Sequence, residues 1–556
     1  MTPAQRSRTG LASLPPELIL RIIDLADPPS QVSLACTSKY IAGCCHSRFL
    51  RLRAAHKKYG VSSDLDPSTV PHLIRSALGY ADPIDAWSVR SFELWGTRSS
   101  WDEWRPFNLE ASTPYTVQDG EPLQWSFLEG ETEALVGVFK DQMTGEEQRS
   151  AEDELREGKD GFLKAVLLAL LPWLVDVKIV SGASDRSLSW LSKSFRWGRQ
   201  RATWPPGFAS ILDVAVGVSS GTWRDEMNES LSAYTFVSVL QLPHIRSLQF
   251  RGLNTGDDDE GDVAEDDTVW HTATEDLPDS LPLERLILDD MHQRNSYFWD
   301  HFICEPAALE AVAFRGSRNY QDYEFDGLTE ALSKWQSASL KRFMLYNAHN
   351  VRGYRCSAYH PDELEPCTSL RHVCIPVEDI EQEAEWSPEA QFGQEKISAV
   401  VERIFADPLE VLVVSKARDN PGRPEVMDTA IARMIEEEWY KGLQAVFLDQ
   451  LEMTESPERE KILFQKAMRA GEKMGVDVYT KTNRRKKVHE LDLLVPLGKY
   501  DLLTGPYGRK GKEGLKLDLK TGEWGPSGCN ACGRCDDCLK VYVAELWDTI
   551  RPNPDE

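Results

Sequence analysis

The sequence contains no apolar run long enough to cross a bilayer. The longest run, residues 162–175, includes Lys164 and Pro172 and falls short of the roughly 20 residues that a spanning helix needs. We interpret it as a buried helix that leads into a strand. The first ten residues, MTPAQRSRTG, lack the apolar core of a secretion signal. We therefore expect no membrane association and an intracellular location, cytoplasmic or nuclear.

Basic residues are scarce relative to acidic ones. The 556 residues include 63 Lys and Arg against 89 Asp and Glu, so the formal net charge at pH 7 is −26. This excess repels the phosphates of DNA and RNA, and we expect no nucleic-acid partner. Hydrophobic residues make up 41% of the chain and include 17 tryptophans, which excludes wholesale disorder.

Two common signatures of catalytic centres are missing. Neither an HExxH zinc motif nor a P-loop occurs, and the 11 histidines are dispersed. Glycines recur at three-residue steps between Gly505 and Gly514, but Lys512 is followed by Glu513 where a P-loop has Ser or Thr. We predict no catalytic residues and no enzymatic activity.

Residues 11–55 predict three short helices. Leu14, Leu18, Ile22 and Leu25 recur at spacings of 4, 4 and 3, which places them on one stripe of a helix. Ser13 can cap this helix and the Asp27-Pro28-Pro29 run ends it, while Ser30 can cap the next. Three helices this short cannot bury all their apolar surface among themselves. The remainder packs either on the rest of this chain or on another polypeptide.

These residues resemble the F-box. The resemblance rests on Leu11, Leu14-Pro15, Glu17-Leu18, Ile22, Leu25, Leu34 and Ser38-Lys39. It departs from the family at Ala26, where many relatives have leucine before the aspartate. The resemblance implies a non-catalytic adaptor that docks on the Skp adaptor and cullin scaffold of a ubiquitin ligase, or else a ligase-independent F-box scaffold. The implied contact residues are Leu14, Pro15, Leu18, Ile22, Leu25 and Leu34.

Nine later segments share the pattern apolar-x-x-apolar-x-apolar, which is typical of strands in a repeat array. They read LVDVKI, ILDVAV, IRSLQF, LERLIL, LEAVAF, LKRFML, LRHVCI, LEVLVV and LQAVFL, and they begin at residues 174, 211, 245, 283, 309, 340, 370, 409 and 443. Helical patterns lie between them. Strands that alternate with helices predict a parallel sheet with helical crossovers.

This body resembles the degenerate leucine-rich repeats that accompany F-boxes in many proteins, although the usual asparagine after the strand is missing. A closed α/β sheet is the alternative to a solenoid. We predict an α/β fold in which a three-helix F-box precedes an irregular leucine-rich-repeat-like solenoid. The expected parts are a flexible N-terminus (1–10), the F-box (11–55), an irregular connector (56–165), the body (166–480) with an acidic loop (254–280), and a C-terminal segment (481–556).

In such repeats, the residue between the last two apolar positions faces the concave side. From the fourth segment onward these residues are all apolar, and an exposed strip of this kind would bind a protein target. The candidates are Ile287, Met344, Val413 and Phe447. The alternative is that an insertion or the C-terminal segment covers the strip.

Four cysteines lie within ten residues near the C-terminus, at Cys529, Cys532, Cys535 and Cys538. Glycine and polar neighbours surround them, so core packing does not explain the cluster. A tetrahedral Zn²⁺ site, a redox or free-thiol cluster and an Fe–S cluster all remain open, because the even three-residue spacing matches no common template.

Overall fold

The computed structural model describes most of the chain up to residue 479 and two short strands beyond it. The described residues are 10–26, 28–108, 116–180, 186–217, 231–254, 281–291, 298–316, 327–346, 364–376, 401, 408–415, 424–448, 464–479, 515–518 and 523–526. Within these ranges, no helix is both long enough and apolar enough to span a membrane.

The chain opens with three helices, as predicted. After a 3-10 turn at Leu11–Ser13 come α1 (Pro16–Leu25), α2 (Pro28–Ala35) and α3 (Lys39–Tyr59). The N-cap of α1 is Pro15 and not Ser13, and α2 begins at Pro28 and not after Ser30, because proline is well suited to a first helical turn. Ser38 caps α3, since its hydroxyl accepts a hydrogen bond from the Ile41 amide at 3.2 Å.

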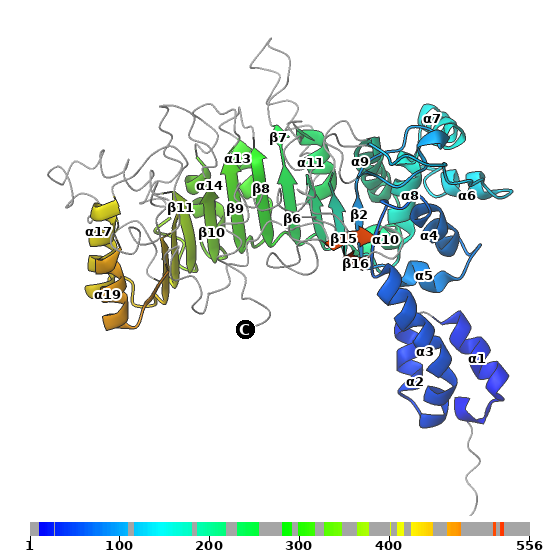
Figure 1. Ribbon diagram of the computed structural model, residues 1–556, viewed down its shortest axis with the longest axis horizontal. Coiled ribbons are helices and arrows are strands. Elements are labelled where there is room, and N and C mark those ends of the chain that lie inside the picture. The colour runs from blue at the N-terminus through cyan, green and yellow to red at the C-terminus, as the bar shows by residue number, and fades with distance from the viewer. Residues whose placement is uncertain are drawn as a thin grey trace, which may run out of the picture.

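All nine predicted strand segments form strands of one parallel sheet (Figure 1). They are β3 (Asp176–Ile179), β4 (Asp213–Val216), β6 (Ser247–Arg251), β8 (Arg285–Met291), β9 (Ala311–Gly316), β10 (Arg342–Tyr346), β11 (His372–Pro376), β12 (Val411–Ser415) and β13 (Ala445–Leu448). Three more strands complete the sheet of twelve: β1 (Val61–Ser63), β2 (Ser91–Leu94) and β14 (Asp477–Tyr479).

The strands follow one another across the sheet in chain order, with β1 and β14 at its two edges. The sheet is therefore open and not closed. Residues 56–165, predicted as an irregular connector, in fact supply the first two strands, so the prediction for this segment was wrong.

Helices connect the strands. They are α4 (Thr69–Ala77), α5 (Pro83–Ser88), α6 (Glu131–Gly137), α7 (Gly145–Glu157), α8 (Gly161–Leu170), α9 (Arg186–Arg199), α10 (Pro206–Ser210), α11 (Ala233–Leu240), α13 (Phe298–Ile303), α14 (Leu328–Gln336), α17 (Pro424–Glu436) and α19 (Gln465–Met474). The apolar run at 162–175 is largely α8, whose residues Gly161 to Ala169 are all buried, and it leads into β3 as expected. The 3-10 turn Trp101–Glu103 and four short strands lie outside this alternation. β5 (Leu231–Ser232) pairs with β7 (Leu253–Asn254), and β15 (Leu515–Asp518) pairs with β16 (Glu523–Pro526).

The two faces of the sheet bury different side chains. The spaced apolar residues of each strand, such as Val177 and Ile179 in β3, join the helices in one continuous core. The residues between them point to the opposite face, where Ile287, Met344 and Phe447 belong to a second apolar cluster. The two-residue period of a strand produces this separation.

Candidate docking surface

The three N-terminal helices have a small core of their own. Ile19, Ile23, Ile41 and Cys45 are at most 2% exposed and pack together. Leu14 and Leu34, two of the residues predicted to contact a partner, lie partly buried against this core. Their main packing is therefore inside the helical unit.

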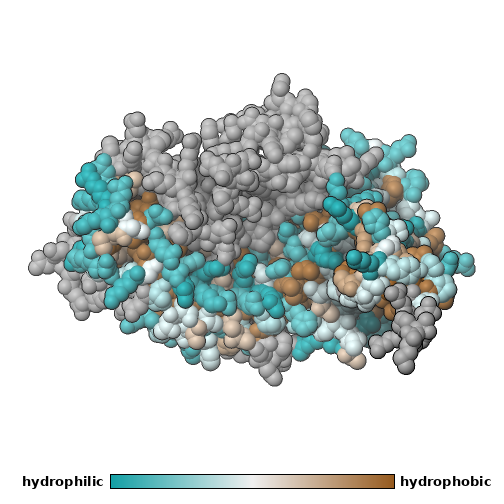
Figure 2. Space-filling model, turned by 90° about the horizontal axis from the view of Figure 1, so that it is seen from below, coloured by the Kyte–Doolittle hydropathy of each residue, from teal (hydrophilic) through white to brown (hydrophobic). Residues whose placement is uncertain are grey.

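Other predicted contact residues remain open to solvent. Leu18 is 52% and Leu25 is 76% exposed, and Pro15 is also exposed. Ile22 lies between Leu18 and Leu25 on the same side of α1 and is half-buried. Val32 on α2 adds a further exposed apolar side chain at 51%. In Figure 2, brown hydrophobic patches are visible at the end of the molecule where these helices lie.

We call Leu18, Ile22 and Leu25 the α1 stripe. It is not needed to complete the core of the three helices, which Ile19 and Ile23 fill from the other side of α1. Exposed leucines two turns apart on one side of a helix are typical of a surface that another polypeptide covers.

A buried glutamine, which the sequence analysis did not single out, fixes the turn between α1 and α2. Gln31 is fully buried, and its Nε2 donates hydrogen bonds to the carbonyls of Ile23 and Ala26, each at 2.9 Å. Carbonyls at the end of a helix lack their regular helical partners. The Gln31 side chain supplies a donor to the Ala26 carbonyl and a second donor to the Ile23 carbonyl, which also accepts from the Ala26 amide at 3.2 Å. The only signal in the sequence was a long polar residue two positions after Pro28-Pro29.

Helix α3 joins the three-helix unit to the sheet and its helices. Ile41 and Cys45 near its start belong to the core of the helical unit, whereas Ala55 and Tyr59 near its end belong to the core of the sheet. Its 21 residues span about 31 Å. Figure 1 shows the three helices standing clear of the sheet, below its first strands.

Polar contacts hold the end of α3 against the body. Arg51 forms an ion pair with Asp82, and His56 Nδ1 lies 3.2 Å from the Ser88 carbonyl oxygen. Because α3 is continuous and is anchored in both cores, the α1 stripe has a fixed direction relative to the sheet.

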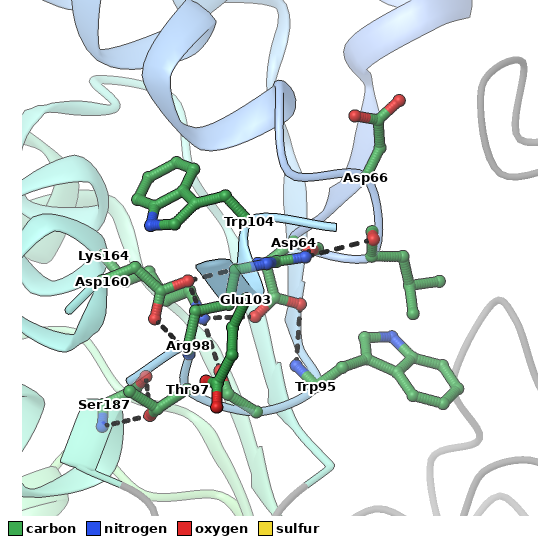
Figure 3. A network of polar contacts seen from close by, with 12 residues as sticks. Asp64, Asp66, Trp95, Thr97, Arg98, Glu103, Trp104, Asp160, Lys164 and Ser187 are labelled. Atoms are coloured by element: carbon green, nitrogen blue, oxygen red, sulfur yellow. Dashed lines mark hydrogen bonds and ion pairs between the residues drawn. The ribbon is translucent and has the colours of Figure 1, made fainter. Parts of the chain in front are cut away.

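A buried network of charges lies where the sheet begins (Figure 3). Lys164 of α8 is fully buried, and its Nζ lies 2.7 Å from Asp64 and 2.9 Å from Asp160. It also donates a hydrogen bond to the Gly96 carbonyl. Arg98 lies 3.2 Å from Asp160, and its guanidinium also donates to the carbonyls of Asp64 and Arg105, each at 2.9 Å.

The network ties four chain segments together around Asp64, which follows β1. Asp64 Oδ1 accepts a hydrogen bond from the Trp95 amide at 2.8 Å. Burial raises the pKa of the Asp64 carboxyl, while Lys164 and Arg98 oppose that rise. All four charged side chains are at most 1% exposed, so the network has no access to a substrate and we assign it a structural role.

The predicted target-binding strip is buried. Ile287, Met344, Val413 and Phe447 are 2–3% exposed and form one apolar cluster across neighbouring strands. The prediction of an exposed strip was therefore wrong, and the covered alternative agrees with the structure. An apolar face of this extent is unfavourable in water, which explains why it is dry.

Three sequence features fall outside the described residues: the flexible N-terminus apart from Gly10, nearly all of the acidic loop, and Cys529, Cys532, Cys535 and Cys538. The expectation that the GxSxG pattern of serine hydrolases is absent was wrong, because residues 217–221, GVSSG, match it. They follow β4, but Ser219 lies outside the described residues. Among the described residues, no group of His, Cys, Asp and Glu could hold a metal ion.

Comparisons with known proteins give little further information. No family model matches the chain, and no curated protein matches it. Among solved structures, the chain is similar to one from the crystal structure of the Rad7 and Elc1 complex in yeast. The two are 12% identical, the match covers 46% of this chain and 73% of that one, and the TM-score is 0.18. At this TM-score the likeness supports no conclusion about function.

Proposed function

We propose that this chain is a non-catalytic, F-box-type adaptor of a cullin–RING ubiquitin ligase. Its three N-terminal helices dock on the Skp adaptor, and its repeat body holds a protein target. The observation that carries the proposal is the α1 stripe, in which Leu18 and Leu25 are exposed although the core beneath them is complete.

The stripe can supply useful binding energy. Burying an exposed leucine is worth about 1.5–3 kcal/mol, so Leu18 and Leu25 together with Ile22 provide a central apolar anchor. The F-box resemblance, which includes these three residues, suggests what covers them.

The attachment of the helices also suits an adaptor. A ligase must hold its target at a defined position relative to the scaffold. Helix α3 spans both cores and is fastened to α5 through Arg51 and Asp82, so the body cannot swing freely about the docking helices.

The test is co-purification of the Skp adaptor and the cullin with the full-length chain from cells. We expect Leu18→Asp combined with Ile22→Asp to abolish this association, since two charges would have to be buried in an apolar interface. The matched control is Leu128→Asp, which places the same charge on a leucine that is 45% exposed and lies outside the helical unit. Wild-type recovery of the adaptor with the double variant would contradict the proposal.

A second candidate is an F-box scaffold that works independently of the ligase. The departure from the family at Ala26, next to Leu25, favours it, since a smaller side chain there weakens an apolar interface. In the same experiment, a scaffold of this kind would recover the Skp adaptor without the cullin.

A further inference from the structure

A polar hollow lies at the edge of the sheet where the strands begin. Strands β4, β6, β8, β9 and β10 start with Asp213, Ser247, Arg285, Ala311 and Arg342, and these five residues pair with one another in register. They line a cavity of about 300 Å³. This edge lies on the same side of the sheet as the docking helices in Figure 1, and Figure 2 shows hydrophilic side chains across the middle of this side.

Several charged side chains around the hollow act on one another, and Arg285 and Arg246 both oppose the rise that burial causes in the pKa of the Asp213 carboxyl. Glu284 is paired with Arg246 at 3.7 Å, and Glu310 with Lys341 at 2.6 Å. The guanidinium of Arg285 makes no ion pair or hydrogen bond within the described part of the chain. A positive group therefore faces the hollow on a protein whose overall charge is −26.

The spacing of the two arginines suits an oxyanion. Arg285 and Arg342 are separated by β9, so their Cα atoms lie about 10 Å apart across two strand spacings. Ala311 lies between them and is itself buried, at 4% exposure. Guanidinium groups bind carboxylates and phosphoryl groups through paired hydrogen bonds. Asp213, beyond Ser247, repels an anion from the other half of the hollow.

We propose that Arg285 and Arg342 bind an anionic side chain, a phosphoryl ester or a carboxylate, on a segment of the protein target. Only the origin of that segment rests on the proposed function. A nucleotide fits poorly, because none of the described residues that line the hollow is aromatic and could stack on a base. A long polyanion is disfavoured by the charge of the whole protein, so the ligand is a short segment.

The experiment is a ³¹P NMR titration of acetyl-Gly-phosphoserine-Gly-amide with the full-length chain, in which line broadening reports binding. We expect Arg285→Gln with Arg342→Gln to weaken binding at least tenfold, since charge-assisted hydrogen bonds are lost. The control, Arg156→Gln with Arg433→Gln, removes two arginines that already pair with Asp153 and Glu437 away from the hollow. It should bind like the wild type.

Equal broadening by the two double variants would overturn the assignment. Broadening of inorganic phosphate without any effect on the peptide would exclude a target segment as the ligand. If acetyl-Gly-Glu-Gly-amide displaces the phosphoserine peptide, the site also accepts a carboxylate. If it does not, the site is restricted to phosphoryl groups. Both results support the site. Neither arginine lies in the docking helices, so adaptor co-purification tests the proposed function separately.

Discussion

Removing Lys164 from the buried charge network should strongly destabilise the start of the sheet. In Lys164→Met, Asp64 and Asp160 would stay buried without the ammonium that lies 2.7 and 2.9 Å from them. Breaking a buried ion pair in this way costs about 3–5 kcal/mol. Asp160 retains Arg98 at 3.2 Å, so most of the cost falls on Asp64.

The loss of stability caused by Lys164→Met should depend on pH. Burial raises the folded-state pKa of Asp64 above its usual value near 3.8, and Lys164 is the strongest opposing influence. The variant's folded-state pKa is therefore higher still. A carboxyl whose pKa is higher in the folded state than in the unfolded state stabilises the folded state at pH values below its unfolded-state pKa. That stabilisation is lost as the pH rises through the folded-state pKa. The penalty of Lys164→Met should therefore grow from pH 5 to pH 8.

The assay is urea unfolding followed by tryptophan fluorescence, because Trp95 and Trp104 lie beside the network (Figure 3). Adding Asp64→Asn to Lys164→Met should recover at least about 1 kcal/mol and remove the added pH dependence, since the amide oxygen still accepts from the Trp95 amide. Lys334→Met, at an exposed pair with Asp300, should cost less than about 1 kcal/mol. A cost at Lys164 as small as that at Lys334, or one that does not change with pH, would refute this reasoning.

Three further substitutions test the packing, each by urea unfolding. Met344→Ala should cost about 2–5 kcal/mol because the strip is buried, and a cost below about 0.5 kcal/mol would show that it is open. Gly207→Ala should cost about 1–3 kcal/mol or more, since its Cβ would lie 1.9 Å from the Leu168 carbonyl oxygen, and a neutral effect would contradict that contact. Gln31→Ala should cost about 1–3 kcal/mol by leaving the Ala26 carbonyl without a partner and the Ile23 carbonyl with the Ala26 amide alone, and unchanged stability would mean that water replaces the side chain.

The strands that could be predicted are those with a strong apolar period. Each of the nine segments places three large apolar residues toward the helices, and that pattern is readable without a structure. Strand β1 has no such pattern, because VSS is short and partly polar. Residues 89–94, VRSFEL, do match the pattern with Val89, Phe92 and Leu94, which are buried in the same core, so β2 could have been predicted and was missed. Both strands are held by neighbouring strands and by the network around Asp64, whose members are distant in sequence.

The docking residues could be predicted only in part. Helix α1 is apolar on two sides, with Leu18 and Ile22 adjacent in sequence to Ile19 and Ile23, so spacing alone does not distinguish the inner side from the outer one. Leu14 and Leu34 proved to pack on the core. Exposure of the concave strip was equally unpredictable, because it depends on contacts between segments that the repeat pattern does not encode.

The most direct test of the central claim is the dissociation constant between the purified Skp adaptor and this chain. We predict measurable binding by the wild type and at least a 100-fold loss when Leu18→Asp is combined with Leu25→Asp, because two exposed anchors of about 1.5–3 kcal/mol each become charged. Leu128→Asp should stay within about twofold of the wild type. No binding by the wild type, or equal constants for all three proteins, would contradict the account.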